Sequence, residues 1–441
     1  MTRKTRRILF STAVVAFVAI GFVVLMYAQG YRWDFQNNKF VLAGAIYIEP
    51  IGPKETDISV NNKSTDNKSA SLIKNLLPMR KYDVKVTKAD YQPWEKEFEV
   101  TPGIVVNAEN IILFPETLKT QIILPDPVLS DFSISPNQKF IAVVSGNFKL
   151  SIKNYSGDTA SSTPISFADK KKTISAGISK NNSGWSPNSK KLIFWREIAQ
   201  TSKQRTSVTN WYVWDSENGS LTDLTSLYER KIVLKQASST PLPTKFVPNK
   251  ILWFGNDNNL LVLIGGNILE MDIKNESVKD LSLNDVMDFD SFENKIIALK
   301  SPDILILMES AVQNISALGQ AKFPAQKVLF SNDGNKIAYS NGSAIGVMWL
   351  KDTDKQPFKK TGEQETIYQG TGYISEIYWH KYNEYIIFLE SRKLSAVELD
   401  KRGKMNIASW PETISAISYI PKDQKLFILE PGLIKSVDGE F

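Results

Sequence analysis

The chain has 441 residues, of which 42% are hydrophobic and 11% aromatic, so it can bury a sizeable core. Its formal net charge of +6 comes mainly from four basic residues within residues 3–7, and after these the basic and acidic residues nearly balance. A chain with such balanced charge has no extended basic surface for binding the phosphate backbone of a nucleic acid. Nucleic acid is therefore not expected as a partner.

Residues 8–28 are an uncharged, apolar run, and as a helix they would span about 31 Å, the thickness of a bilayer's hydrocarbon core. Tyr27, Tyr31 and Trp33 would lie at the depth of an interfacial aromatic belt. We therefore predict that residues 1–7 are a cytoplasmic basic segment and that residues 8–28 are a single-pass signal-anchor in the lipid bilayer of the cell membrane. Everything after Ala28 would be extracytoplasmic.

Two other interpretations of this run stay open. A cleavable signal peptide normally has a shorter apolar run and a small-residue cleavage site, whereas the best site here, after Ala28, has Met26 three residues before the cut. A buried helix of a soluble protein is the other alternative.

Residues 40–115 contain short strand patterns separated by polar, turn-rich breaks such as residues 61–67, and they predict a small β-sandwich. The candidate strands are residues 45–48, 57–60, 82–87, 96–100 and 105–113.

This stretch resembles the PEGA domain, a small sandwich found on the outside of bacterial and archaeal membranes. Residues 44–50 are similar to the opening strand of that family, and Pro50-Ile51-Gly52-Pro53 stands where its naming tetrapeptide falls. Residues 77–86, followed by residues 89–91, are similar to its later strand and terminal Gly-Tyr. The resemblance implies a binding or spacer module without catalytic residues. The departures from the family pattern are Ile51 for Glu, Pro53 for Ala, Met79 for the turn Gly and Asp90 for the Gly before Tyr91.

A short phrase then recurs seven times: an aromatic strand end, a turn rich in Pro, Asn, Asp and Gly, a polar residue and an apolar strand. The apolar strands begin at Phe140, Leu192, Leu260, Ile296, Ile337, Tyr385 and Leu426. Repeats of roughly 40–50 residues made of short strands are typical of a β-propeller with one four-stranded sheet per repeat. The chain is therefore predicted to be all-β, with a seven-bladed β-propeller over residues 118–441.

The turn Ser186-Pro187-Asn188-Ser189-Lys190 is similar to the Ser-Pro-Asp-Gly-Lys turn of TolB-like and WD40-like arrays. This resemblance implies recognition of a protein or a glycan and does not imply a reaction.

The last repeat offers only three strands of its own, whereas each blade needs four. Closure of the propeller therefore requires one further strand from elsewhere in the chain. Residues 118–124, between Pro115 and Pro125, are unassigned and rich in Ile and Leu. We expect this strand to complete the last blade, because closure removes an exposed sheet edge.

The longest interval between repeats contains two polar or proline-rich stretches, residues 196–208 and 240–248. Trp211, Trp214 and Trp253 flank them and are candidate ligand-contact residues, as a platform for stacking a sugar or a peptide. The alternative is that they are strand residues that pack between blades.

The sequence offers little catalytic chemistry. It contains no cysteine and a single histidine, His380, and no nucleophile elbow, phosphate loop, dinucleotide or zinc-protease motif. His380 falls in a turn of the sixth repeat and is expected to be exposed. Asp285, Asp288, Asp290 and Glu293 are expected in an inter-strand turn, although carboxylates at this density could also bind a cation.

These observations predict a non-catalytic, membrane-anchored binding or scaffolding protein of the cell envelope that recognises an envelope protein or glycan through its propeller. No catalytic residue, metal or cofactor is expected. Two alternatives stay open: an extracytoplasmic hydrolase or lyase that acts on carbohydrate with a pair of propeller carboxylates, and an accessory or sensor subunit of a membrane complex.

Overall fold

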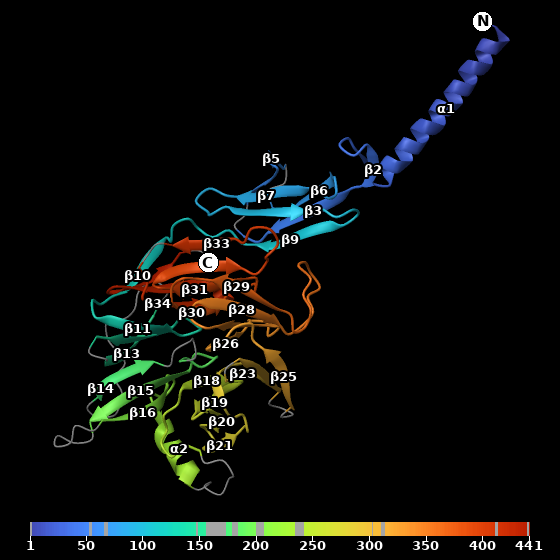
Figure 1. Cartoon of the computed structure of the whole chain (residues 1–441). Helices are drawn as coiled ribbons and strands as arrows, with labels where there is room; N and C mark the ends of the chain where they lie inside the picture. Colours follow the sequence, from blue (N-terminus) through green and yellow to red (C-terminus); the bar gives the residue numbers. More distant parts are fainter. Residues whose placement is uncertain are drawn as a thin grey trace. The chain divides into compact units, whose positions relative to one another are not determined.

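The structure is a computed structural model of the whole chain (Figure 1). It describes residues 2–52, 55–65, 69–146, 149–155, 173–178, 184–199, 207–233, 242–301, 303–309, 314–410, 413–438 and 441. Pro53 of the PEGA-like tetrapeptide, and residues 200–206 and 240–241 of the two long stretches, lie outside the described residues.

The chain folds as two compact units. The first comprises Met1–Thr117, Thr353–Phe358 and Asp400–Asn406, and the second comprises Leu118–Asp352, Lys359–Leu399 and Ile407–Phe441. Almost all regular structure is β, with one long apolar helix at the N-terminus, as the sequence predicts.

Helix α1 (Arg3–Ala28) opens the first unit and buries none of its side chains against the protein (Figure 1). The length and composition of α1 suffice to cross a membrane, a property that membrane anchors and signal sequences share. The helix begins within the basic segment and ends at Gln29, and Gly30 (φ 91°) turns the chain into a hairpin of β1 (Tyr31–Asp34) and β2 (Lys39–Leu42).

Two small sheets follow in the first unit. One has the order β6-β3-β9 and the other the order β5-β4-β7-β8. Apolar residues from both sheets, including Ile46, Val84 and Phe98, form one shared core. The strands are β3 (Gly44–Pro50), β4 (Asp57–Val60), β5 (Lys63–Ser64), β6 (Ser71–Leu76), β7 (Lys81–Thr87), β8 (Trp94–Glu99) and β9 (Val105–Ile111).

Within its described residues, the second unit contains seven antiparallel sheets that follow one another along the chain. The first three sheets are β11 (Leu129–Ile134), β12 (Phe140–Ser145) and β13 (Lys149–Asn154); β14 (Thr173–Ile178), β15 (Lys191–Ala199), β16 (Ser207–Asp215) and β17 (Leu221–Asp223); and β18 (Lys250–Phe254), β19 (Asn256–Ile264), β20 (Asn267–Asp272) and β21 (Ser277–Asp280).

The next three sheets have four strands each. They are β22 (Val286–Phe292), β23 (Lys295–Lys300), β24 (Ile304–Glu309) and β25 (Asn314–Gln320); β26 (Lys327–Phe330), β27 (Lys336–Ser340), β28 (Ala344–Trp349) and β29 (Gln364–Gln369); and β30 (Ile374–Trp379), β31 (Tyr385–Glu390), β32 (Lys393–Glu398) and β33 (Ile407–Trp410).

The seventh sheet joins the two ends of the second unit. Its strands are β34 (Ala416–Ile420), β35 (Lys425–Glu430), β36 (Leu433–Val437) and β10 (Thr120–Pro125). Strand β10 pairs antiparallel with β36, from Thr120 opposite Val437 to Pro125 opposite Leu433. Apolar residues of the seventh and first sheets, among them Ile123 and Ile141, share one core, so the series of sheets returns to its start.

The recurring sequence phrase has one structural role. In the first six sheets each copy lies between the first two strands, as between β11 and β12 or between β26 and β27, and the seventh copy lies between β34 and β35. Strand β34 is counted as the first strand of the seventh sheet. The turns also connect neighbouring sheets. The Asn137 N–H donates to Ser189 Oγ of the next copy at 2.9 Å, and the Asn332 N–H donates to Asn383 Oδ1 at 2.9 Å. Pattern residues therefore stabilise both the turn itself and the contact between successive sheets.

A second set of hydrogen bonds connects neighbouring sheets, from residues in or following their first strands. Indole N–H groups donate backwards to backbone carbonyls: Trp185 to Ser133 O, Trp253 to Gly184 O and Trp379 to Leu329 O. The aromatic strand end of the sequence phrase is thus both an apolar packing residue and, where it is Trp, a donor to the preceding sheet.

Two expectations are wrong. Asp288 and Asp290 lie within strand β22 and not in a turn, because each accepts a backbone N–H of β26: Val328 to Asp288 Oδ2 at 2.9 Å and Phe330 to Asp290 Oδ2 at 2.7 Å. Among the described residues, no group of three or more His, Asp or Glu could hold a metal ion.

His380 is fully buried, contrary to the expected exposure. Its turn is covered by Phe441, whose carbonyl lies 3.0 Å from His380 Nε2 and accepts the Tyr419 hydroxyl at 3.1 Å. Burial lowers the pKa of His380 to about 4, so the ring is neutral at physiological pH. These surroundings are those of a buried structural residue.

Sequence patterns also missed the hairpin β1–β2, the short strand β5, strand β6 and helix α2 (Leu224–Val233). Leu224, Leu227, Tyr228 and Ile232 of α2 are buried in the core shared by the second and third sheets. The helix is short and lies inside the longest interval between repeats, where the strand period gives no information about it.

The pairing of β10 predicts a contrast between two neighbouring residues of that strand. Ile123 is 2% exposed in the core of the seventh and first sheets, whereas Ile122 is 50% exposed. Ile123→Ala should lower the free energy of unfolding by about 2–4 kcal/mol because it leaves a cavity, and Ile122→Ala by less than about 1 kcal/mol. Urea denaturation of the full chain in detergent measures both, and equal losses would contradict a buried closing strand.

Candidate functional site

A cavity of about 670 Å³ lies where the first strands of all seven sheets converge. Each of these strands contributes at least one lining residue. The strands and representative residues are β11 (Asp131), β14 (Ile178), β18 (Lys250), β22 (Asp288), β26 (Lys327), β30 (Glu376) and β34 (Ile417). No short sequence motif could have identified this site, because its members are spread over almost three hundred residues.

Ionisable side chains line this cavity: the carboxylates of Asp131, Asp288 and Glu376, and the ammonium groups of Lys250 and Lys327. Most of their hydrogen bonds run between sheets. Lys250 Nζ donates to Asp288 Oδ1 at 2.9 Å and also to the Phe289 carbonyl, while Lys327 Nζ donates to the Ser375 carbonyl. These charges therefore satisfy backbone and side-chain groups of neighbouring first strands.

Glu376 is a strongly perturbed carboxyl of the cavity. Its pKa is raised to about 7, mainly by burial and in smaller part by the nearby charge of Asp131, while the Ile417 N–H, which donates to Oε2 at 3.3 Å, acts in the opposite direction. The Tyr378 hydroxyl lies 3.2 Å from the same oxygen and donates to the Ile417 carbonyl at 2.9 Å. At neutral pH this carboxyl is close to half-protonated, so it can donate or accept a proton.

Aromatic and apolar groups form the more open part of the lining. Tyr373 is 62% exposed and Met287 is also exposed, while Trp195 and Trp211 are half-buried cross-strand partners on β15 and β16. Flat aromatic faces beside hydroxyl and carboxylate groups suit a ligand with both apolar and polar surface.

The three tryptophans proposed from the sequence have different surroundings. Trp211 lines the cavity, as the platform interpretation requires. Trp214 and Trp253 are buried, Trp214 in the core of the first and second sheets and Trp253 in the core of the second and third. The structure adds Trp195, Tyr373 and Glu376 to the lining of the cavity. Sequence analysis had no signal for them, because the repeat pattern does not mark these positions.

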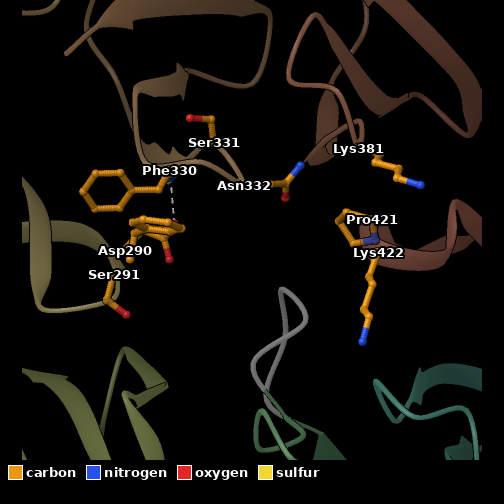
Figure 2. A pocket seen from close by; sticks show the side chains of 9 residues that line it. Asp290, Ser291, Phe330, Ser331, Asn332, Lys381, Pro421 and Lys422 are labelled. Atoms are coloured by element: carbon orange, nitrogen blue, oxygen red, sulfur yellow. Dashed lines mark hydrogen bonds between the residues drawn. The ribbon is translucent and has the colours of Figure 1, made fainter. Parts of the chain in front are cut away.

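A second cavity, of about 470 Å³, lies at the other ends of several of the same first strands, beside the turns (Figure 2). Figure 2 shows Asp290 hydrogen-bonded to the backbone at Phe330, with Asn332, Lys381 and Lys422 across the opening. The pKa of Asp290 is raised to about 6, because the effect of burial exceeds the opposing effect of the nearby Lys250 charge. Asn332 and Lys381 are engaged in contacts between turns: Asn332 Nδ2 with Asn383 Oδ1 and Lys381 Nζ with Gln424 Oε1. We therefore regard the larger cavity as the better candidate site.

No protein-family model matches the sequence, and no curated protein matches it. Among solved structures, the chain is similar to the β-propeller domain of Cps50 (Swd1) from Myceliophteria thermophila, with 12% identity and a TM-score of 0.46 over 73% of this chain and 99% of that one. It is also similar to PorZ, an essential bacterial surface component of the type-IX secretion system of Porphyromonas gingivalis, with 14% identity and a TM-score of 0.44. That similarity covers 73% of this chain and 38% of PorZ.

The environment of Glu376 predicts a pH dependence of stability. A raised pKa means that the folded protein holds this proton more tightly than the unfolded chain, whose value is near 4.5. The resulting stabilisation is complete below about pH 4.5 and is lost as pH rises through about 7. Glu376→Gln, which keeps an acceptor for Ile417, should therefore gain about 2–3 kcal/mol relative to the unsubstituted protein between pH 5 and pH 8.

Urea denaturation at the two pH values measures this difference, with Glu293→Gln as the control because Glu293 is exposed. If the advantage of Glu376→Gln were the same at both pH values, the carboxyl would not have the buried environment described above.

Proposed function

We propose that this protein is a non-catalytic binding or scaffolding protein of the cell envelope, anchored in the membrane by α1 and exposed on the extracytoplasmic side. Its ligand would be an envelope protein or a glycan that enters the cavity between the first strands. The observation that carries this proposal is the cavity itself: its open part is aromatic, whereas most of its charged groups already bind neighbouring strands.

The proposal includes a finer description of the fold. We infer that the seven sheets of residues 118–441 are the blades of a seven-bladed β-propeller, closed by the strand that sequence analysis places at residues 118–124. We also infer that residues 40–115 form a PEGA-like β-sandwich and act as a spacer. Support comes from the sheet order, from β10 in the seventh sheet and from the core shared by the two small sheets.

The topology can be tested with engineered cysteines, because the chain has none of its own. A cysteine replacing the exposed Asn218 should react with a membrane-impermeant maleimide in intact spheroplasts, since the basic residues before α1 should stay cytoplasmic. A cysteine replacing Thr2 should react only after the membrane is permeabilised. The opposite pattern of labelling would refute the proposed orientation.

Ligand binding at the cavity can be tested by photo-crosslinking in intact cells. Tyr373 at the cavity, replaced by p-benzoylphenylalanine, should form adducts with an envelope component, whereas the same replacement at Ile315 should not. Ile315 is a suitable control because it is 47% exposed, lies on the last strand of the fourth sheet and does not line the cavity. Trp211→Ala should reduce the Tyr373 adducts if the aromatic lining binds the ligand. Equal yields at both positions would argue against a specific site.

One observation favours a second candidate function, a carbohydrate-active hydrolase or lyase. Glu376 and Asp131 line the same cavity, and Glu376 has the raised pKa that a general acid requires. In an assay of the purified protein on envelope polysaccharides, turnover that disappears in both Glu376→Gln and Asp131→Asn would support this alternative. The binding proposal expects no turnover in the unsubstituted protein.

A further inference from the structure

The hairpin that follows α1 has two chemically different faces. Strands β1 and β2 are in register with Tyr31 opposite Leu42 and Trp33 opposite Phe40. Since directly opposed residues share one face of a hairpin, these four side chains form what we call the aromatic face. Trp33 and Phe40 contact each other edge to face, with ring centroids 4.9 Å apart. The other face carries Arg32, Asp34, Lys39 and Val41.

The aromatic face is only partly covered by protein. All four of its side chains are half-buried, and none of them belongs to the core that the two neighbouring sheets share. Leu42 lies against Gly103. Phe35, at the tip of the hairpin, is 82% exposed, more than any other large apolar side chain among the described residues. A two-stranded hairpin is marginally stable in water, so this surface is expected to have a further partner.

Polar contacts fix the hairpin to the end of α1. The Arg32 guanidinium donates to the carbonyls of Tyr27 and Tyr31, at 2.9 and 2.7 Å, and lies 3.8 Å from the centroid of the Tyr27 ring. It also donates to Asn75 Oδ1 at 2.6 Å. On the same face, Asp34 accepts from Arg80 at 2.8 Å. The polar face is therefore occupied by the helix end and by the folded part of the first unit, which leaves the aromatic face available.

The depth of the hairpin relative to the bilayer follows from the length of α1. If the uncharged residues 8–28 fill the hydrocarbon core, Arg32 lies where hydrocarbon gives way to headgroups, at the usual depth of Arg and aromatic side chains. Three residues of extended chain cover about 10 Å, so Phe35 stays close to the headgroup layer, which is roughly 5–8 Å thick on each side.

From this geometry we infer that the hairpin β1–β2 is a second membrane contact, with the aromatic face and Phe35 seated in the lipid headgroup region. The partner is a lipid surface, which suits aromatic side chains at the boundary between headgroups and acyl chains. This inference rests on the proposed role of α1 as an uncleaved anchor.

The test uses the full chain and its lack of cysteine. Phe35→Cys and Lys39→Cys, each labelled with the environment-sensitive dye NBD, are reconstituted into vesicles of phosphatidylcholine and phosphatidylglycerol. Lys39 is the matched control because it is exposed and lies on the opposite face of the same hairpin. We expect a blue-shifted emission from the dye at position 35, and we expect lipids carrying a quencher on the headgroup to quench that emission. The dye at position 39 should emit as in water and be quenched by iodide.

Flotation of the vesicles distinguishes a failure of the proposed hairpin contact from a failure of the proposed membrane anchor. If the protein floats and both dyes emit as in water, the hairpin does not contact lipid, while the anchor stands. If the protein floats and both dyes show blue-shifted emission, the aromatic face is not the specific lipid-facing surface and the inference is refuted. If the protein does not float, the anchor itself fails and the inference fails with it. The two labelled variants should show the same unfolding transition, because neither side chain is buried.

Discussion

The second unit depends on hydrogen bonds between the first strand of one sheet and the first strand of the next. A first strand pairs with its own sheet along one edge only, so the N–H and C=O groups of its other edge need partners. Asp288, Asp290 and Glu376 accept backbone N–H groups of the following sheet, and Lys250 and Lys327 donate to backbone carbonyls of the following sheet. The sheets are thereby held in sequence around the cavity.

This arrangement explains why the cavity is rich in charge. Its ionisable groups have structural partners, so a dense group of carboxylates in a channel is not by itself evidence for catalysis. Burial still raises the pKa of Glu376 in this cavity to about 7, and that of Asp290, beside the smaller cavity, to about 6. In the proposed binding function, ligand selection depends on the aromatic groups that remain open, Tyr373 and Trp211 among them.

At the N-terminus, a single arginine connects three parts of the first unit. Arg32 contacts the last turn of α1, the hairpin and Asn75 at the end of β6. Because the hairpin is held by its polar face, its aromatic face is directed away from those contacts. In the proposed membrane orientation, a helix alone would leave the following domain free to reorient at the bilayer surface, whereas a lipid-facing hairpin attached to the helix would restrict that freedom.

The sequence by itself determined the features that are encoded over short distances. The uncharged run of residues 8–28, the turns of the seven repeats and the strand near residues 118–124 each follow from local composition, because turn chemistry and strand alternation are local properties. Only the tertiary structure decided the burial of His380, the place of Asp288 and Asp290 in β22 and the grouping of Trp195, Trp211, Tyr373 and Glu376. Those outcomes depend on contacts between residues far apart in the chain: Phe441 covers His380, and β26 supplies the N–H groups that the carboxylates of β22 accept. A local sequence pattern cannot predict these contacts. It determines where a strand forms, but not which side chains from distant segments pack against that strand.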